Sequence, residues 1–324
     1  MADFSQFLDF EQPVVEVEQA LERMRAVVES GDLTRATEVE KLEKKLEKVR
    51  SDVYGNLTAY QRVRLSRHFE RPFTQDYIEH FITDFVELHG DRLYADDKAI
   101  ISGIGKFNSQ PVMVVGQQRG RSTQERIKRN FGMPHPEGYR KALRMFELAE
   151  KFGMPLILFI DTQGAYPGLG AEERGQAEAI ARNLLVLARL KTKIISVVIG
   201  EGGSGGALAL GVCDRLLMME NSTYSVITPE GCASILWGKA ESESVGEYAK
   251  IAADALQLTA QSLLAKGVAD EIVPEPPGGA HRDRFQAAEL LGQAIAKQLT
   301  SLSEESLESL LEKRYEKFRK LGAV

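Results

Sequence analysis

The feature that most constrains the fold is a pattern repeated in the middle of the chain. A short apolar run is followed by a glycine-rich stretch and then by residues that suit a helix. The runs "PLILFI" and "KIISVV" are continuously apolar rather than alternating, which is typical of strands buried on both faces of a sheet. From about residue 99, β-rich runs alternate with helical segments, which predicts an α/β domain. The expected strands are "AIISGIGKF", "PVMVVGQQ", "PLILFID", "KIISVVIG", "RLLMME" and "TYSVIT".

Helical periodicity predicts the remaining elements of this part of the chain. Helices are expected over residues 137–152, 172–190, 205–212 and 247–266, and over the segment "PEGCASILWG". The Pro/Gly-rich stretch "VADEIVPEPPGGAHRDR" is interpreted as a connection. The charged, amphipathic end "SEESLESLLEKRYEKFRKLG" is expected to form a terminal helix.

The first 90 residues show helical periodicity without strand signals. Apolar residues at 3,4 spacing on either side of "SGDLT" predict a helical hairpin, whose charged exterior suits either solvent or docking on another chain. A third helix is expected from Thr74 as N-cap to Leu88, with Gly90 as its stop. We therefore predict three parts: a helical region at 1–90, the α/β domain at 91–275, and a linker with a C-terminal helix at 276–324.

Composition excludes several classes of protein. No apolar run approaches the ~20 residues of a membrane span, and the start "MADFSQFLDF" lacks a signal-peptide pattern, so an intracellular protein is expected. The net charge of −6 gives no reason to expect nucleic-acid binding. Cys213 and Cys232 are expected to be small core residues, and His68, His80, His89 and His135 show no metal-ligand spacing, so no metal is predicted.

The glycine-rich stretch "IGEGGSGGALALG" fits three kinds of site. Gly200, Gly202 and Gly205 spell a dinucleotide motif, but the helix that would follow is shorter than the ~10 residues of a usual crossover. Ser204 lies in a G-x-S-x-G motif, but only His281 lies downstream, in a stretch expected to be an exposed loop. The third possibility is a row of free peptide N–H donors.

A second stretch of similar design, "DTQGAYPGLGAEERGQ", favours the third possibility. Both stretches follow a strand and precede a helix, so their loops are expected to face one cavity. The peptide N–H groups of Gly164, Ala165, Gly205 and Gly206 would then donate to an oxyanion, aided by the positive ends of the following helices. Glycine is expected there because a Cβ would hold the ligand away.

Five segments together resemble one known family. They are "VVGQQRGRSTQERIKRNFGMPHPEGYRKALR", "FIDTQGAYPG", "GEGGSGGALALG", "TPEGCASILW" and "LTAQSLLAKGVADEIV". In order and spacing they are similar to the carboxyltransferase alpha subunit of the multi-subunit bacterial and plastid acetyl-CoA carboxylase. One departure is Gln163, where that family commonly has proline.

This resemblance implies a crotonase-like fold built as a spiral of ββα units. It also implies an activity, the transfer of a carboxyl group from carboxybiotin to acetyl-CoA to make malonyl-CoA for fatty acid synthesis. Carried over, Gly205 and Gly206, with Gly164 and Ala165 opposite, would form the oxyanion hole that faces biotin. The alternatives left open are a crotonase-fold hydrolase using Ser204 and a non-catalytic assembly subunit.

The resemblance also implies partners. The chain has no four-cysteine zinc ribbon, no "MKM" biotin-attachment site and no glycine-rich ATP loop of carboxylase type. A zinc-bearing beta subunit in an α2β2 heterotetramer, a biotin carboxyl carrier protein and an ATP-dependent biotin carboxylase would supply them, in the cytoplasm or the plastid stroma. Carboxybiotin and acetyl-CoA are then substrates, and no cofactor is held covalently.

Basic residues beside the two glycine stretches are candidates for substrate binding. Arg119 and Arg121 belong to a basic cluster after "VVGQQ", and Arg174 follows the second glycine stretch. Their guanidinium groups suit the phosphates of CoA or a substrate carboxylate. Surface ion pairs within the chain are an equally good explanation.

Overall fold

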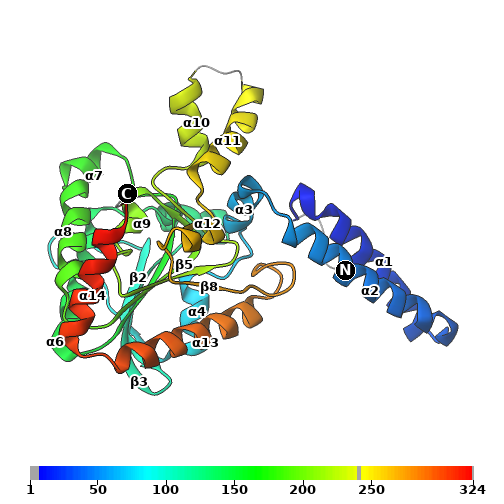
Figure 1. Cartoon of the computed structure of the whole chain (residues 1–324), viewed down its shortest axis with the longest axis horizontal. Helices are drawn as coiled ribbons and strands as arrows, with labels where there is room; N and C mark the ends of the chain where they lie inside the picture. Colours follow the sequence, from blue (N-terminus) through cyan, green and yellow to red (C-terminus); the bar gives the residue numbers. More distant parts are fainter. Residues whose placement is uncertain (1–6, 239–241, 323–324) are drawn as a thin grey trace.

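An eight-stranded sheet organises the chain (Figure 1). The computed structural model describes residues 7–238 and 242–322. The strand order is β1-β2-β3-β4-β5-β6-β8, and β7 pairs with the end of β5. β2 is antiparallel to both of its neighbours, β1 and β3, whereas β3, β4, β5, β6 and β8 run parallel. The strands are β1 Thr83–Glu87, β2 Ile100–Phe107, β3 Gln110–Gln117, β4 Leu156–Thr162, β5 Ile194–Gly203, β6 Arg215–Met219, β7 Thr223–Ser225 and β8 Glu271–Val273.

Helices cover both faces of the sheet, as the continuous apolar runs predict. Leu156, Leu158 and Ile160 of β4 pack in one core with helices α6 (Pro136–Phe152) and α8 (Gln176–Arg189). Ile157 and Phe159 pack in a second core with α4 (Thr74–Phe81) and α13 (Arg284–Ser303). Since neighbouring side chains of a strand point to opposite faces, both faces need apolar residues. Each such buried side chain contributes about 1.5–3 kcal/mol relative to exposure. The predicted α/β architecture is therefore confirmed.

The α-helices lie before, between and after the strands of the described chain. They are α1 Gln12–Glu29, α2 Ala36–Gly55, α3 Ala59–Ser66, α4 Thr74–Phe81, α5 Thr123–Lys128, α6 Pro136–Phe152, α7 Leu169–Glu173, α8 Gln176–Arg189, α9 Ser204–Leu208, α10 Pro229–Trp237, α11 Ser242–Leu256, α12 Ala260–Ala265, α13 Arg284–Ser303 and α14 Leu307–Lys320. Two helical hairpins, α1–α2 and α10–α11, project from the body (Figure 1). No described helix is long and apolar enough to span a membrane.

The helix predicted over 74–88 is wrong in its second half. α4 ends at Phe81, and the following residues form β1 at the edge of the sheet, paired with β2. Asp84, with a φ of 52°, adopts the left-handed conformation within this edge strand. Apolar residues at helical spacing continue through this point, so periodicity alone does not reveal the switch to strand pairing.

Thr74 is not the N-cap of α4. Phe73 takes that position, and its N–H donates to the carboxylate of Asp76 at 2.6 Å. The Thr74 hydroxyl instead donates to the backbone oxygen of Gln117 at 2.6 Å, which ties α4 to the end of β3. The sequence pattern correctly predicts where the helix starts but assigns the wrong partner to the hydroxyl.

Two helices predicted as continuous are broken. The stretch 172–190 divides at Gly175, whose φ of 80° places it in the left-handed region between α7 and α8. The stretch 247–266 divides at Gln257, with a φ of 48°, between α11 and α12. The helix expected at 205–212 ends at Leu208. At Gly175 and Gln257 the positive φ interrupts the helix, so two shorter helices form in place of each predicted one.

The N-terminal hairpin is confirmed. α1 and α2 bury Val14, Val17, Leu21 and Leu46 along one seam, and the rest of the pair is largely polar. The seam is therefore closed within the hairpin. Docking of the hairpin on another chain stays a prediction.

The C-terminal stretch contains more structure than the sequence predicts. β8 lies inside the Pro/Gly-rich connection, and α13 precedes the expected terminal helix α14. Leu291 and Leu299 of α13 are part of one of the two cores of the sheet. The division into parts at residues 90 and 275 stays a prediction.

The buried Arg314 fastens α14 to the sheet. Its guanidinium contacts both carboxylate oxygens of Asp214, at 2.7 and 2.9 Å. It also donates to the backbone oxygens of Leu187, Leu190 and Thr192, each at 2.8 Å. All of the donating nitrogens are thus used, which makes burial of the charge tolerable.

Candidate active site

The two glycine-rich stretches lie at neighbouring strand ends. β4 and β5 run parallel, and Thr162 is paired with Gly202 near their carboxyl ends. The chain leaves β4 through residues 163–168, here called the β4 loop, and passes directly from β5 into α9 through residues 203–206, the β5 turn. Since the carboxyl ends of parallel strands meet at one edge, the two segments come together there.

Glycine is required at two positions because the β4 loop and the β5 turn touch. A Cβ on Gly203 would lie 2.2 Å from the oxygen of Gln163, and a Cβ on Gly206 would lie 2.4 Å from the nitrogen of Ala165. The expected reason for these glycines, room for a ligand, is therefore wrong at these two positions: the opposite segment occupies the space. Gly205 differs, because a Cβ there would meet only the Ile180 side chain, at 3.8 Å.

The four predicted N–H donors are not equivalent. Gly164 donates its N–H to Oγ1 of Thr162 at 3.1 Å, so that donor is already satisfied. Gly205 and Gly206 lie in the first turn of α9, where N–H groups have no acceptor inside the helix. The N–H of Ala165 has no acceptor among the described residues. Ala165, Gly205 and Gly206 are therefore the donors that remain available.

The electrostatic contribution of α9 itself is small. The helix has five residues instead of the predicted span 205–212, and the chain continues in turns in which Leu210 donates to Ala207 and Gly211 to Leu208. A helix this short sums few peptide dipoles. The predicted aid from the helix end is therefore minor here, and the N–H groups themselves supply the positive potential.

Ser204 lies at the sharpest point of the β5 turn without the partners of a nucleophile. Its φ of 56° is left-handed, a conformation that costs a residue other than glycine about 1–2 kcal/mol. His281 is buried rather than in an exposed loop, and its Nε2 lies 2.9 Å from Oε1 of Glu11, which precedes α1. No histidine among the described residues hydrogen-bonds to Ser204, so no catalytic triad is formed.

One buried group has the residue types of a metal site. Ligand atoms of Glu11, His68 and His281 lie within 4.8 Å of one another, a grouping that their spacing in the sequence does not reveal. The carboxylate of Glu11 is already engaged, since it accepts from the Leu8 N–H, the Tyr54 hydroxyl and the His281 ring. Burial alone would raise the pKa of Glu11, but the bonds from His281 and Tyr54 outweigh it and lower the pKa to about 2. The group therefore acts as an anchor between the hairpin and the body.

Arg119 is partly buried in an ion-pair network with residues of β4 and β5. Its guanidinium contacts Asp161 at 3.1 Å and Glu201 at 3.0 Å, and Arg67 contacts Glu201 at 2.7 Å. Burial raises the pKa of Asp161, and Arg119 offsets only part of that shift. Burial also opposes ionisation of Glu201, but the charges of Arg119 and Arg67 outweigh it and hold its pKa below the usual range. Arg119 thus links the ends of β4 and β5.

The other two candidate arginines are also paired within the chain. Arg121 contacts Asp76 at 2.7 Å and lies over the ring of Phe73. Arg174 binds Glu137 through two nitrogens, at 3.0 and 3.2 Å, and also lies over the ring of an exposed tyrosine. Substrate binding by Arg119, Arg121 and Arg174 stays a prediction.

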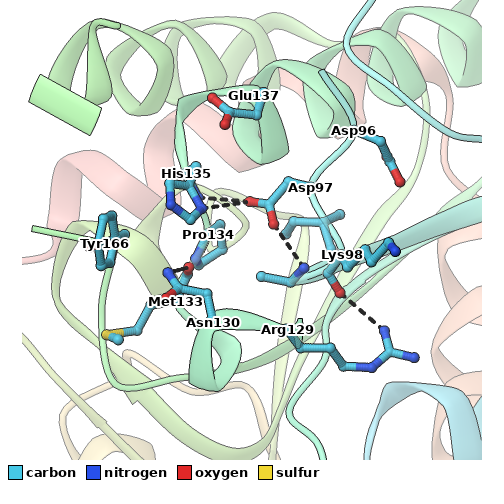
Figure 2. Close-up of polar contacts among 12 residues, drawn as sticks. Asp96, Asp97, Lys98, Arg129, Asn130, Met133, Pro134, His135, Glu137 and Tyr166 are labelled. Atoms are coloured by element: carbon cyan, nitrogen blue, oxygen red, sulfur yellow. Dashed lines mark hydrogen bonds and ion pairs between the residues drawn. The ribbon is translucent and has the colours of Figure 1, made fainter. Parts of the chain in front are cut away.

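The β4 loop is supported from its outer side. The Tyr166 N–H donates to the oxygen of Pro134 at 3.0 Å, and the rings of Tyr166 and His135 lie 4.5 Å apart (Figure 2). The N–H of His135 in turn donates to Asp97 at 2.7 Å. Burial raises the pKa of Asp97, and the bonds that its carboxylate accepts offset only part of that effect. The loop is therefore held on both sides before any substrate binds.

A mostly apolar cavity opens beside the β5 turn. Its volume is about 350 Å³. It is lined by Ser204, Gly205, Leu208, Tyr224, Ser225, Val226, Leu256, Leu263 and Val268. An apolar cleft with a few backbone donors at its edge is typical of a small-molecule site.

Two residues of the site, Arg67 and Gln117, are not predicted from the sequence. Arg67 lies far along the chain from Glu201 and Glu230, yet it contacts both. Gln117 is completely buried between β4 and α9. No local motif marks either residue, because the contacts exist only after the sheet has formed.

The fold of the chain is crotonase-like. It is similar to the solved structure of transcarboxylase 12S, with a TM-score of 0.53 and 22% identity, over 68% of this chain and 41% of that one. The family described as acetyl co-enzyme A carboxylase carboxyltransferase-like matches residues 7–322.

Curated relatives agree with the family match. Acetyl-coenzyme A carboxylase carboxyl transferase subunit alpha of Halalkalibacterium halodurans is 55% identical over 97% of this chain and 95% of its own. The protein of the same name from Geobacter metallireducens is 56% identical over 97% of each chain. The chain belongs to this family of carboxyltransferase alpha subunits, as the five segments in its sequence indicate.

Proposed function

We propose that this chain transfers a carboxyl group from carboxybiotin to acetyl-CoA, giving malonyl-CoA, as the alpha subunit of a multi-subunit acetyl-CoA carboxylase. Membership of the family supports the reaction. The observation that supports the site is the contact between the β4 loop and the β5 turn, which brings Ala165 beside Gly206, next to Gly205 in the lining of an apolar cavity. The donors proposed are the N–H groups of Ala165, Gly205 and Gly206.

The chemistry suits backbone donors. When carboxybiotin loses its carboxyl group, negative charge collects on the ureido oxygen, and N–H groups aimed at that oxygen stabilise it. The ureido nitrogen then takes a proton from the methyl group of acetyl-CoA, and the resulting enolate attacks the released CO2. No step requires a protein nucleophile, in agreement with the isolation of Ser204 from any histidine. Loss of one such donor typically lowers kcat about 10²–10³-fold.

The proposal also includes the protein partners of the chain. We expect a beta subunit to complete the site in an α2β2 assembly, to bear the zinc and to supply the donors that face acetyl-CoA. A biotin carrier protein and an ATP-dependent biotin carboxylase would load the biotin. We expect the protein to act in the cytoplasm, or in the stroma if it comes from a plastid.

The decisive experiment reconstitutes the chain with a beta subunit. Malonyl-CoA-dependent carboxylation of free biotin would be measured for wild type, Gly206→Val and Ser204→Ala. We expect Gly206→Val to lose at least about 10²-fold in kcat, while Ser204→Ala remains active. Equal rates for wild type and Gly206→Val would exclude the proposed site and leave an assembly role. Complete loss in Ser204→Ala would favour a hydrolase-type nucleophile.

A further inference from the structure

We propose that Gln117 is a positioning residue that sets the geometry of the oxyanion donors. Gln117 is the last residue of β3 and is 0% exposed. Its Oε1 accepts the backbone N–H of Asp161 at 2.9 Å, and its Nε2 donates to the backbone oxygen of Gly206 at 2.7 Å. One planar side-chain amide thus joins the strand end that starts the β4 loop to the β5 turn.

The bond to Gly206 bears directly on the proposed donors. The carbonyl of Gly206 belongs to the planar peptide group between Gly206 and Ala207, so a hydrogen bond to it fixes the orientation of that plane. The direction of the Gly206 N–H relative to that plane then depends only on the φ and ψ angles of Gly206. Glycine has wide conformational freedom, so an external constraint matters more here than at other residues. Gln117 supplies that constraint from the body of the sheet.

The bond to Asp161 constrains the other segment. Besides donating its N–H to Gln117, Asp161 accepts the N–H of Glu201 through Oδ1 at 3.1 Å. Its carboxylate also faces Arg119. The residue before the β4 loop is therefore bonded both to β3 and to β5. Of the residues that contact Asp161 here, Gln117 is the one that also hydrogen-bonds to α9.

Gln117 itself has little freedom to move. Its backbone is paired with Ile100 in the antiparallel part of the sheet, and its carbonyl accepts the Thr74 hydroxyl at 2.6 Å. A side chain locked in this way can preorganise a site without reorganisation during the reaction. The two segments are therefore held in register through β3 as well as through direct contact.

The proposal depends on the chemistry of an amide, which offers one acceptor and one donor group at a fixed separation. An ionised carboxylate has acceptors only. In Gln117→Glu the Asp161 N–H keeps its acceptor, but a carboxylate oxygen replaces the donor that lies 2.7 Å from the oxygen of Gly206. Protonation of the introduced carboxyl group would restore a donor there, so the defect is expected to depend on pH.

The neighbouring residue offers a matched control. Gln118 is also buried, at 4% exposed, but its Oε1 accepts the N–H of Gln75, away from both segments. Gln118→Glu keeps that acceptor and makes the same chemical change one residue away. It should follow the wild type at every pH.

This inference rests on the proposed function, and the test separates the two. Chain and beta subunit would be reconstituted, and biotin carboxylation from malonyl-CoA measured for wild type, Gln117→Glu and Gln118→Glu between about pH 6 and 8.5, beside Gly206→Val. A misplacement near 1 Å can cost about 10²-fold. We expect Gln117→Glu to lose roughly that factor in kcat at pH 8.5, with KM values within about 2-fold, and the deficit relative to wild type to shrink at least about 5-fold at pH 6.

Two results would overturn the proposal. One is wild-type activity of Gln117→Met, which removes both bonds without adding charge and should lose about 10-fold or more in kcat. The other is a deficit of Gln117→Glu that does not change with pH. An inactive Gly206→Val beside a normal Gln117→Met leaves the site and removes only the role of Gln117, whereas an active Gly206→Val removes both.

Discussion

The contact between Gly206 and the β4 loop allows a quantitative prediction for Gly206→Ala. The added Cβ would lie 2.4 Å from the nitrogen of Ala165 and 2.6 Å from the carbonyl carbon of Gly164, whereas ordinary contact begins at 3.4 Å. The atoms in the way are backbone atoms, so a rotamer change cannot relieve the overlap. The two segments must separate by about 1 Å, which also moves the proposed donors.

The expected cost follows from that displacement. A misplacement of about 1 Å in a preorganised site lowers the rate about 10²-fold, which corresponds to about 2.7 kcal/mol in activation free energy. The assay is malonyl-CoA-dependent biotin carboxylation by the chain reconstituted with a beta subunit, with circular dichroism and the subunit ratio recorded for each variant.

Gly205→Ala is the matched control. Its Cβ would make ordinary contacts with Ile180 at 3.8 Å and leave the N–H in place. Because the donor geometry is unchanged, we expect a smaller loss of kcat than in Gly206→Ala, set only by the added methyl group at the cavity. A folded Gly206→Ala enzyme with kcat within about 3-fold of wild type would refute the reasoning, because the segments would then not need their close contact for activity.

Three further predictions concern the turn, the C-terminal helix and the hairpin anchor. Ser204→Ala should keep kcat within about 5-fold of wild type, and a loss beyond about 10³-fold in the same assay would restore Ser204 as a nucleophile. Arg314→Met leaves Asp214 buried without its partner and should lower the free energy of unfolding by about 3–5 kcal/mol in urea, with a change under about 1 kcal/mol contradicting the prediction. Because the pKa of Glu11 falls from 4.5 to about 2 on folding, its ionised form stabilises the protein above about pH 4.5, and this contribution, about 3 kcal/mol, is lost as the pH drops toward 2. Glu11→Gln should therefore flatten the acid limb of the stability profile, and identical acid limbs in the two proteins would contradict this.

Local patterns in the sequence correctly predict much of the architecture. The continuous apolar runs predict a sheet covered on both faces. In β4, for example, Leu158 packs in one core and the next residue, Phe159, packs in the other. The 3,4 spacing predicts the hairpin α1–α2. Both patterns predict correctly because the order of apolar and polar side chains along an element determines whether one face or both faces are buried.

Tertiary contacts decide the remaining elements. β1 forms because β2 offers a pairing edge, and the predicted helices are interrupted at Gly175 and Gln257, whose φ values are positive. His281 is buried because Glu11, distant along the chain, packs on it. Periodicity carries no information about such partners.

The candidate site divides in the same way. The sequence by itself determined that two strands end in glycine-rich segments and that the chain belongs with a family of carboxyltransferase subunits. Only the tertiary structure decided which N–H groups remain free, that Gly206 is required by its contact with Ala165, and that Gln117 bridges Asp161 and Gly206. A strand end and a glycine are local properties, whereas a donor aimed at a ligand depends on the distance between segments that only the folded sheet brings together.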